Sequence, residues 1–222
     1  MTRITHHPSD ALLLSHAAGR LPAGLALVVA VHMEACTRCA AYVGALEAAG
    51  GALLEETPPA AMHAQALDQA LAALDAPPAD AARQAPLQGP PPLPQGAAWP
   101  LALALAGSQI APWRWIGRGM RYSRVRLAGD DAVAVFLLRL APGKYLPQHA
   151  HSGREFTQVL CGGFHDGRAQ FHAGDFDAPG RGVHHLPVVQ SAGECVCLTA
   201  VQGRLQFDSV YGRLLGQLAG LA

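Results

Sequence analysis

Two separate groups of metal-ligand side chains stand out in this sequence of 222 residues. The first has the spacing H-x3-C-x2-C and consists of His32, Cys36 and Cys39. Zinc in proteins usually has four ligands in a tetrahedron, and a C-x2-C pair can hold it from a tight turn at the start of a helix. The fourth ligand must come from elsewhere, and His6 or His7, ahead of the first expected helix, could supply it. This group predicts a zinc site.

The second group lies in the C-terminal half, where His149, His151 and Glu155 have the spacing H-x-H-x3-E and His185 follows 30 residues later. Alternate residues of a strand share a face, so the first two histidines would point into a barrel together. Glu155 would reach the same cavity after a turn. Three imidazoles and a carboxylate could hold Zn, Mn, Fe or Ni, so the group predicts one divalent metal without choosing it.

The spacing of the second group resembles the cupin motifs. The first motif is matched at every step by the run Gly143-x5-His149-x-His151-x3-Glu155-x6-Gly162. The second motif fits less well, because its proline is displaced and its terminal asparagine is missing. His184 is an alternative ligand, but His185 keeps the expected distance from Gly174 and is followed by Leu186-Pro187.

Charge and composition narrow the classes of function. Residues 1–85 hold four arginines against eight acids, a balance of −4, and the remainder carries +4. An acidic N-terminal part would repel phosphate, which argues against direct nucleic-acid binding and favours a basic partner.

The number of cysteines is five, which is odd, whereas a disulfide framework pairs an even number. No signal peptide is apparent, and the longest apolar run, Leu25–Val31, is too short to span a bilayer, so a cytoplasmic protein without membrane contact is expected.

The first 75 residues are expected to be helical. Ser9 suits a helix N-cap, Gly19 a helix end and Pro22 the first turn of the next helix. The later helices are expected over Leu25–His32, Cys39–Gly50 and Ala60–Leu74, the last with one apolar face formed by Leu67, Ala70, Leu71 and Leu74. Four short helices make a small core, and structural zinc commonly compensates for that deficit.

A proline-rich segment separates this part from a β-rich one. Residues 76–98 contain seven prolines and no aromatic residue, which is typical of an extended tether. Strands are expected over Ala132–Leu140, Phe156–Leu160 and Cys195–Val201, punctuated by glycines. The expected fold class is therefore multidomain α + β: a zinc-binding helical domain (1–75), a linker (76–98) and an antiparallel jelly-roll barrel of cupin type (99–222).

The remaining histidines and cysteines are expected to be structural. His16 and His63 lack ligand partners in sequence and are interpreted as surface residues, and His165 and His172 as turn residues. Cys195 and Cys197 share one strand face. We interpret them as buried strand residues rather than as an oxidant-sensitive thiol pair, which would need exposure and a lowered pKa.

The first group of ligands resembles that of a known domain. His7 and His32-x3-Cys36-x2-Cys39, in the setting HHPSDALL…VVAVHMEACTRC, are similar to the zinc-binding anti-sigma domain. Nearly the whole chain, including the acidic segment Gly50–Thr57, resembles the ChrR-type anti-sigma factors, in which that domain precedes a cupin domain. The resemblance selects His7 over His6 as the fourth ligand.

The resemblance also implies a function. The helical domain would wrap an extracytoplasmic-function sigma factor in a 1:1 complex and block its contacts with RNA polymerase, with Ala60–Leu74 as one arm of the clamp. The cupin domain would sense a stress, singlet oxygen or related peroxide chemistry, that releases the sigma factor. Such a transcription regulator would not be an enzyme.

Two rival functions come from other classes. A cupin dioxygenase or related metalloenzyme with an accessory zinc module would turn over a small organic substrate. A DNA-binding zinc module is the weaker rival, because the helical part is acidic and has no recognition helix rich in arginine or lysine.

Overall fold

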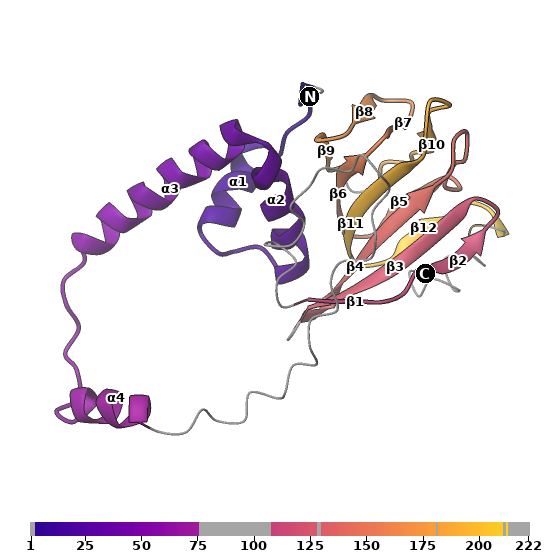
Figure 1. Ribbon diagram of the computed structural model, residues 1–222. Coiled ribbons are helices and arrows are strands. Elements are labelled where there is room, and N and C mark those ends of the chain that lie inside the picture. The colour runs from indigo at the N-terminus through magenta and orange to yellow at the C-terminus, as the bar shows by residue number, and fades with distance from the viewer. Residues whose placement is uncertain (1–2, 76–107, 128–129, 181, 211, 213–222) are drawn as a thin grey trace.

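The computed structural model describes residues 3–75, 108–127, 130–180, 182–210 and 212. Within them, four helices precede twelve strands (Figure 1). The helices are α1 (Asp10–Ala17), α2 (Ala23–Ala35), α3 (Thr37–Glu55) and α4 (Ala66–Asp75). The strands are β1 (Gln109–Ile110), β2 (Arg114–Gly117), β3 (Met120–Leu127), β4 (Asp130–Leu140), β5 (His149–His151), β6 (Arg154–Cys161), β7 (Gly163–His165), β8 (Gln170–His172), β9 (Phe176–Asp177), β10 (Val188–Val189), β11 (Cys195–Gln202) and β12 (Leu205–Phe207).

The helix boundaries follow local chemistry. The Ser9 hydroxyl accepts a hydrogen bond from the Leu12 amide at 3.3 Å and caps α1. Gly19, with φ of +63°, turns the chain out of that helix, and Pro22 is the N-cap of α2. The expectations for Ser9 and Gly19 are confirmed, whereas Pro22, expected in the first turn of its helix, lies directly before that turn. Cys36 interrupts the helical run between α2 and α3 in an extended conformation, which places Cys39 in the first turn of α3.

The strands form an antiparallel fold of cupin type. The largest sheet has the order β1-β3-β4-β11-β6-β9, with β2 paired to β3. Smaller sheets pair β10-β7-β8 and β12-β5, and a bridge joins His149 to His185. The three strands expected from the sequence lie within β4, β6 and β11.

The large sheet is apolar on both faces. Along β11, Val196, Leu198 and Ala200 pack with the helices, whereas Cys195 and Cys197 point into the interior of the β domain. On the outer face α2 lies against β4, β6 and β11 (Figure 1). Because a helix and a sheet each bury an apolar face, α1 to α3 share one core with the sheet.

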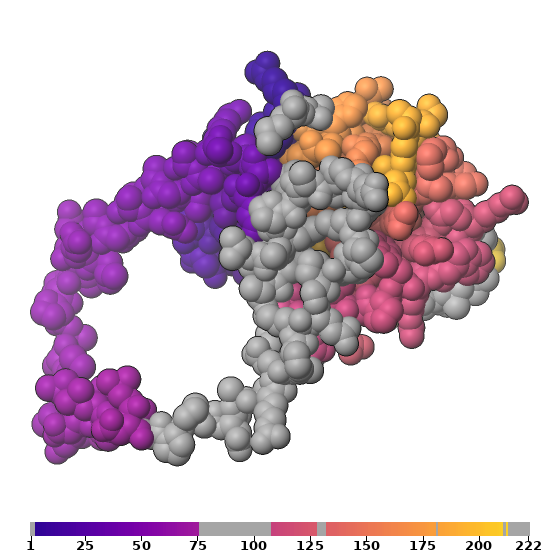
Figure 2. Space-filling view, in the orientation of Figure 1, coloured from indigo at the N-terminus to yellow at the C-terminus, as the bar shows by residue number. Residues whose placement is uncertain are grey.

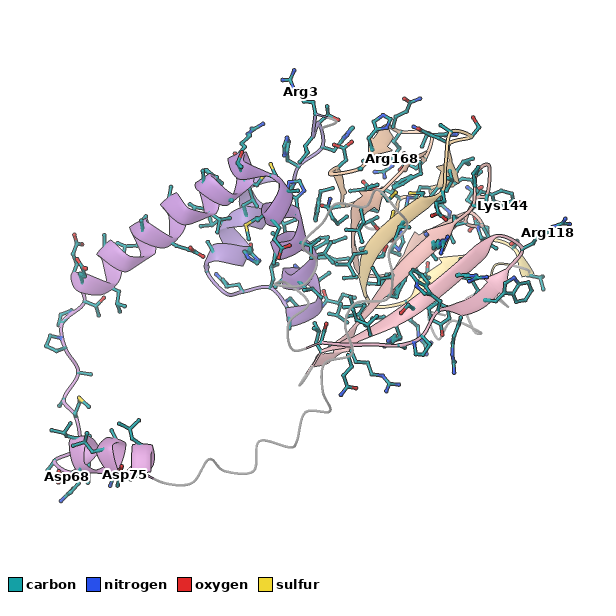
Figure 3. The ribbon with its side chains drawn as sticks, viewed as in Figure 1. Arg3, Asp68, Asp75, Arg118, Lys144 and Arg168 are labelled. Atoms are coloured by element: carbon teal, nitrogen blue, oxygen red, sulfur yellow. The ribbon has the colours of Figure 1, made fainter. Side chains whose placement is uncertain are left out.

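The expectation that four helices form a small core of their own is therefore wrong. Every residue of α4 except the half-buried Ala66 is exposed. Figure 2 shows open space between α4 and the body of the molecule, and Asp68 and Asp75 lie on this separated helix in Figure 3. The helix begins at Ala66 rather than Ala60, and its apolar face is covered by no described residue.

The close approach of α2 to the sheet depends on a glycine. A Cβ added at Gly24 would lie 2.7 Å from side-chain atoms of Val133 and of Val135 on β4, whereas one added at Gly44 on α3 would meet nothing within 4 Å. We expect Gly24→Ala to lower the free energy of unfolding by about 1–3 kcal/mol through overpacking. Gly44→Ala should instead raise it by up to about 1 kcal/mol, because alanine favours helix. Urea unfolding of both variants checks this, and equal stabilities would contradict the shared core.

Some expectations fall outside the described residues. Residues 76–98, expected as the tether, and 99–107, the expected start of the β domain, lie there, so the proposed domain boundaries rest on the sequence. Among the described residues no single helix is long and apolar enough to cross a membrane. The pair α2 and α3 reaches that length and composition only jointly and is bent by 118°.

Candidate metal centres

The four ligands expected near the N-terminus lie together. The ligand atoms of His7, His32, Cys36 and Cys39 all lie within 4.8 Å of one another. Nδ1 of His7 is 3.4 Å from the sulfur of Cys36 and 3.5 Å from that of Cys39. Zinc bonded tetrahedrally to sulfur at about 2.3 Å and nitrogen at about 2.0 Å separates such atoms by about 3.5 Å. The cluster therefore has the dimensions of a tetrahedral zinc site.

The protonation of this cluster also suits a metal. Burial lowers the pKa of His32 to about 4, so its imidazole is neutral, and its Nε2 is buried without a hydrogen-bond partner among the described residues. Burial raises the pKa of the Cys39 thiol to about 12, and the neighbouring Cys36 adds to this effect. A divalent cation would accept the lone pair of His32 Nε2, which has no other partner among the described residues, and would stabilise the Cys39 thiolate against the cost of its burial.

His6 and His7 differ in position, and His7 is the one whose ring nitrogen lies in the candidate cluster. His7 points to the two cysteines, whereas His6 packs against Phe171 in a tilted arrangement with 4.6 Å between ring centroids. Nδ1 of His6 also lies 3.4 Å from a carboxylate oxygen of Asp175. Asp175 was not expected from the sequence to have a role at this site.

The second expected group also converges, inside the β domain. Nε2 of His185 lies 3.0 Å from Nε2 of His149 and 3.0 Å from Nε2 of His151. The carboxylate of Glu155 is 2.7 Å from the His151 ring. Metal bonds of about 2.1 Å at right angles would separate neighbouring ligand atoms by about 3.0 Å. All four residues are buried, whereas the alternative ligand His184 is exposed and pairs with Asp208 at 3.2 Å.

The charges in the second group fit a cation. Nδ1 of His149 donates to the Pro147 carbonyl at 2.7 Å, which leaves its Nε2 lone pair facing the other rings. Burial lowers the pKa of His149, and that of His185 to about 4. Burial alone would raise the pKa of Glu155, but the histidines, His151 foremost, lower it to about 2. The neutral rings of His149 and His185, whose Nε2 atoms lie 3.0 Å apart, would be drawn together by a cation bound between them and the Glu155 carboxylate.

The cavity around this group is small and apolar. Its volume is about 80 Å³, and its lining includes Tyr122, Phe136, Leu138 and Phe207. Ligand pockets that bind drug-sized molecules usually measure about 300–1,000 Å³. The space beside the ligands therefore does not favour the rival dioxygenase with a substrate-sized site.

The remaining cysteines and histidines mostly follow expectation. Cys195 and Cys197 are buried with their sulfurs 3.6 Å apart, which confirms their interpretation as buried strand residues. Contact with Cys195, together with burial, raises the pKa of Cys197 well above its usual value. His165 and His172 end β7 and β8 rather than lying on turns, so that expectation is wrong. His63 is exposed, and His16 is half-buried rather than on the surface as expected.

Sequence reasoning missed the polar residues that contact the ligands from outside. Gln158 on β6 meets His32, and Asp166, which is paired with Arg168, lies 3.7 Å from Nδ1 of His185. Such partners belong to no spacing motif, because folding brings them next to ligand residues that are distant in the sequence. The available signal was Gln158 itself, a polar residue between apolar ones in the strand expected over Phe156–Leu160.

The two clusters define a class of protein in which a helical His/Cys cluster with the dimensions of a metal site packs on a cupin-type domain that contains a His/Glu cluster. Comparison with known proteins identifies one family within this class. Residues 103–204 match the family described as the ChrR cupin-like domain. The anti-sigma-E factor ChrR of Cereibacter sphaeroides is 38% identical over 217 residues, which cover 96% of each chain.

One solved structure gives the same result. The crystal structure of Rhodobacter sphaeroides SigE in complex with the anti-sigma ChrR matches with a TM-score of 0.69 at 36% identity, covering 90% of this chain and 100% of that one. An RmlC-like cupin protein from Ralstonia eutropha matches with a TM-score of 0.39 at 18% identity, covering 46% of this chain and 68% of that one. This chain belongs to the ChrR family of anti-sigma factors.

Proposed function

We propose that this chain is a zinc-dependent anti-sigma factor that holds one extracytoplasmic-function sigma factor in a 1:1 complex. The observation that carries the proposal is the cluster of His7, His32, Cys36 and Cys39 in a chain of this family. The related ChrR was crystallised with SigE, which supports a sigma factor as the partner. The role is regulatory rather than enzymatic, and we place the protein in the cytoplasm, where such a partner works.

The surface for the partner is the exposed apolar face of α3 and α4. Leu53 and Leu54 at the end of α3 are 68% and 73% exposed, and Leu67 and Leu71 on α4 are 68% and 52% exposed. Exposed apolar groups on an unpartnered helix are typical of a protein interface. The acidic balance of residues 1–85 complements the basic surface with which a sigma factor meets nucleic acid.

Zinc in this proposal is structural. Bound by two thiolates and two imidazoles, it would tie the segment before α1 to the junction of α2 and α3, so its binding energy stabilises the fold. The chain's own residues hold the three segments in place: His7 before α1, His32 near the end of α2, and Cys36 with Cys39 at the start of α3.

For the cupin domain we propose one bound divalent metal and a role in release of the sigma factor under oxidative stress, singlet oxygen or related peroxides. The family resemblance supports the signal, and the converging ligands His149, His151, Glu155 and His185 support the metal. Their donor atoms are compatible with Zn, Mn, Fe or Ni.

A charge on the α4 apolar face tests the proposed interface. We expect Leu71→Glu to weaken sigma-factor binding at least tenfold, because a carboxylate at an interface core must be desolvated without a partner. Since Leu71 is 52% exposed, the chain itself should fold normally. Gln69→Glu adds the same charge to another exposed position of α4 and should change affinity by less than about threefold. Calorimetric titration measures both, and equal affinities would contradict this interface.

A further inference from the structure

Strand β6 carries polar side chains to both faces of the large sheet. Glu155 and Thr157 line the cavity of the cupin domain, whereas Gln158 is directed to the other face, where its side chain meets His32 of α2. The alternation of a strand thus places a ligand of the cupin cluster and a partner of the His/Cys cluster three residues apart.

The contact between Gln158 and His32 has a defined direction. Nδ1 of His32 lies 2.9 Å from Oε1 of Gln158, and both side chains are fully buried. The amide nitrogen of Gln158 donates to the Val159 carbonyl at 3.1 Å, which fixes the oxygen toward the imidazole. Because a carbonyl oxygen can only accept, Nδ1 carries the proton and Nε2 is left as the metal-binding atom.

The segment that carries His7 is also held by the cupin domain. Asp175, fully buried in the turn between β8 and β9, accepts hydrogen bonds from the backbone amides of Thr5 at 2.7 Å and His6 at 2.9 Å. The Phe176 amide donates to the His6 carbonyl at 3.0 Å. Two of the four ligands of the His/Cys cluster are therefore positioned by groups of the cupin domain.

We propose that the cupin sheet completes the zinc site of the helical domain, with Gln158 as the positioning residue that sets the tautomer and orientation of His32. This inference rests on the proposed zinc site. Zinc affinity at the His/Cys cluster then depends on the cupin domain. A displacement of β6 at Glu155 reaches His32 through the folded interface, without passing through residues 76–98.

The test removes the Gln158 oxygen that faces His32 and measures metal binding at the His/Cys cluster by a spectroscopic signal of that cluster alone. Cobalt(II) bound by thiolates gives a sulfur-to-metal charge-transfer band that a cupin site of nitrogen and oxygen ligands lacks. In full-length Gln158→Met we expect cobalt and zinc affinity at this site, measured by chelator competition, to fall about tenfold.

Two variants serve as controls. Gln158→Glu keeps an acceptor oxygen and should keep the wild-type affinity within about threefold, because the adjacent cation offsets the buried charge. Gln170→Met makes the same substitution as the test variant at an exposed position of β8 and should change nothing. If Gln158→Met binds as tightly as the wild type, or Gln158→Glu loses as much as Gln158→Met, the inference is overturned.

The wild-type chain provides a test that needs no variant. Nitrogen-15 chemical shifts of the zinc-loaded protein should show His32 protonated at Nδ1 and metal-bound at Nε2. Metal bound at Nδ1 would overturn this inference and leave the proposed zinc site standing. Absence of the thiolate band from cobalt-loaded wild-type protein would instead contradict the proposed zinc site itself.

Discussion

Replacing Cys36 and Cys39 by alanine is expected to abolish both zinc retention by the helical domain and binding of the sigma factor. The two cysteines are 4% and 2% exposed and lie with His7 at the junction of α1, α2 and α3. Binding of structural zinc by small domains contributes about 10–16 kcal/mol, so its loss should unfold the arrangement that presents α3 and α4.

Metal analysis and calorimetric titration with the sigma factor measure the two effects. Cys161→Ala, which removes a half-buried thiol outside both clusters, is the matched control and should retain both properties. A double variant that lacks zinc but binds the sigma factor with full affinity would contradict the structural role of the metal.

The same site should bind zinc less tightly as pH falls. Because burial raises the pKa of Cys39 to about 12, its thiol is protonated in the metal-free chain and must lose that proton to bind zinc. The pKa of His32 is lowered to about 4, so this histidine does not compete for protons above about pH 5. The apparent zinc affinity should therefore fall at least about tenfold per unit between pH 8 and pH 6, through thiol protonation.

Replacing His149 by alanine or Glu155 by glutamine is expected to remove the cupin metal, to leave sigma-factor binding intact and to impair release. Both side chains line the cavity inside the barrel, on the opposite face of the sheet from α2. Metal content should fall by one ion per chain, and sigma-factor affinity should stay within about threefold of wild type. Release is measured after exposure to a singlet-oxygen generator or to a peroxide.

His184→Ala is the matched control, because His184 is exposed and lies next to the ligand His185 without joining the cluster. It should keep the second metal and respond to stress as the wild type does. Constitutive release by the His149 or Glu155 variants would mean that the cupin domain only supports the helical domain.

The sequence predicted the parts of the molecule whose chemistry is local. Ser9 and Gly19 bound α1 as expected, because capping depends on neighbouring residues. The grouping of six of the eight ligand residues could also be predicted, since the close spacing of His32, Cys36 and Cys39, and of His149, His151 and Glu155, limits where their side chains can reach. His7 was selected over His6 by family resemblance, and His185 over His184 by its distance from Gly174 in the second cupin motif. Both lie in their clusters.

What the sequence could not reveal depends on packing between distant segments. The four helices were expected to form a small core of their own, but the apolar residues of α2 are buried by the outer face of β4, β6 and β11 instead. Gln158 and Asp175 lie 126 and 169 residues from the segments that they contact, so no local pattern connects them. The apolar face of α4 was recognised, whereas its exposure became visible only in the fold.

The most direct test of the central claim is capture of the partner by the tagged full-length chain from a lysate of the same organism, with and without a zinc chelator. The full chain is required because α2 is buried against the sheet. We predict that mass spectrometry identifies one extracytoplasmic-function sigma factor, in equal molar amount and only in the zinc-loaded sample. A folded, zinc-loaded chain that captures no sigma factor would contradict the anti-sigma function.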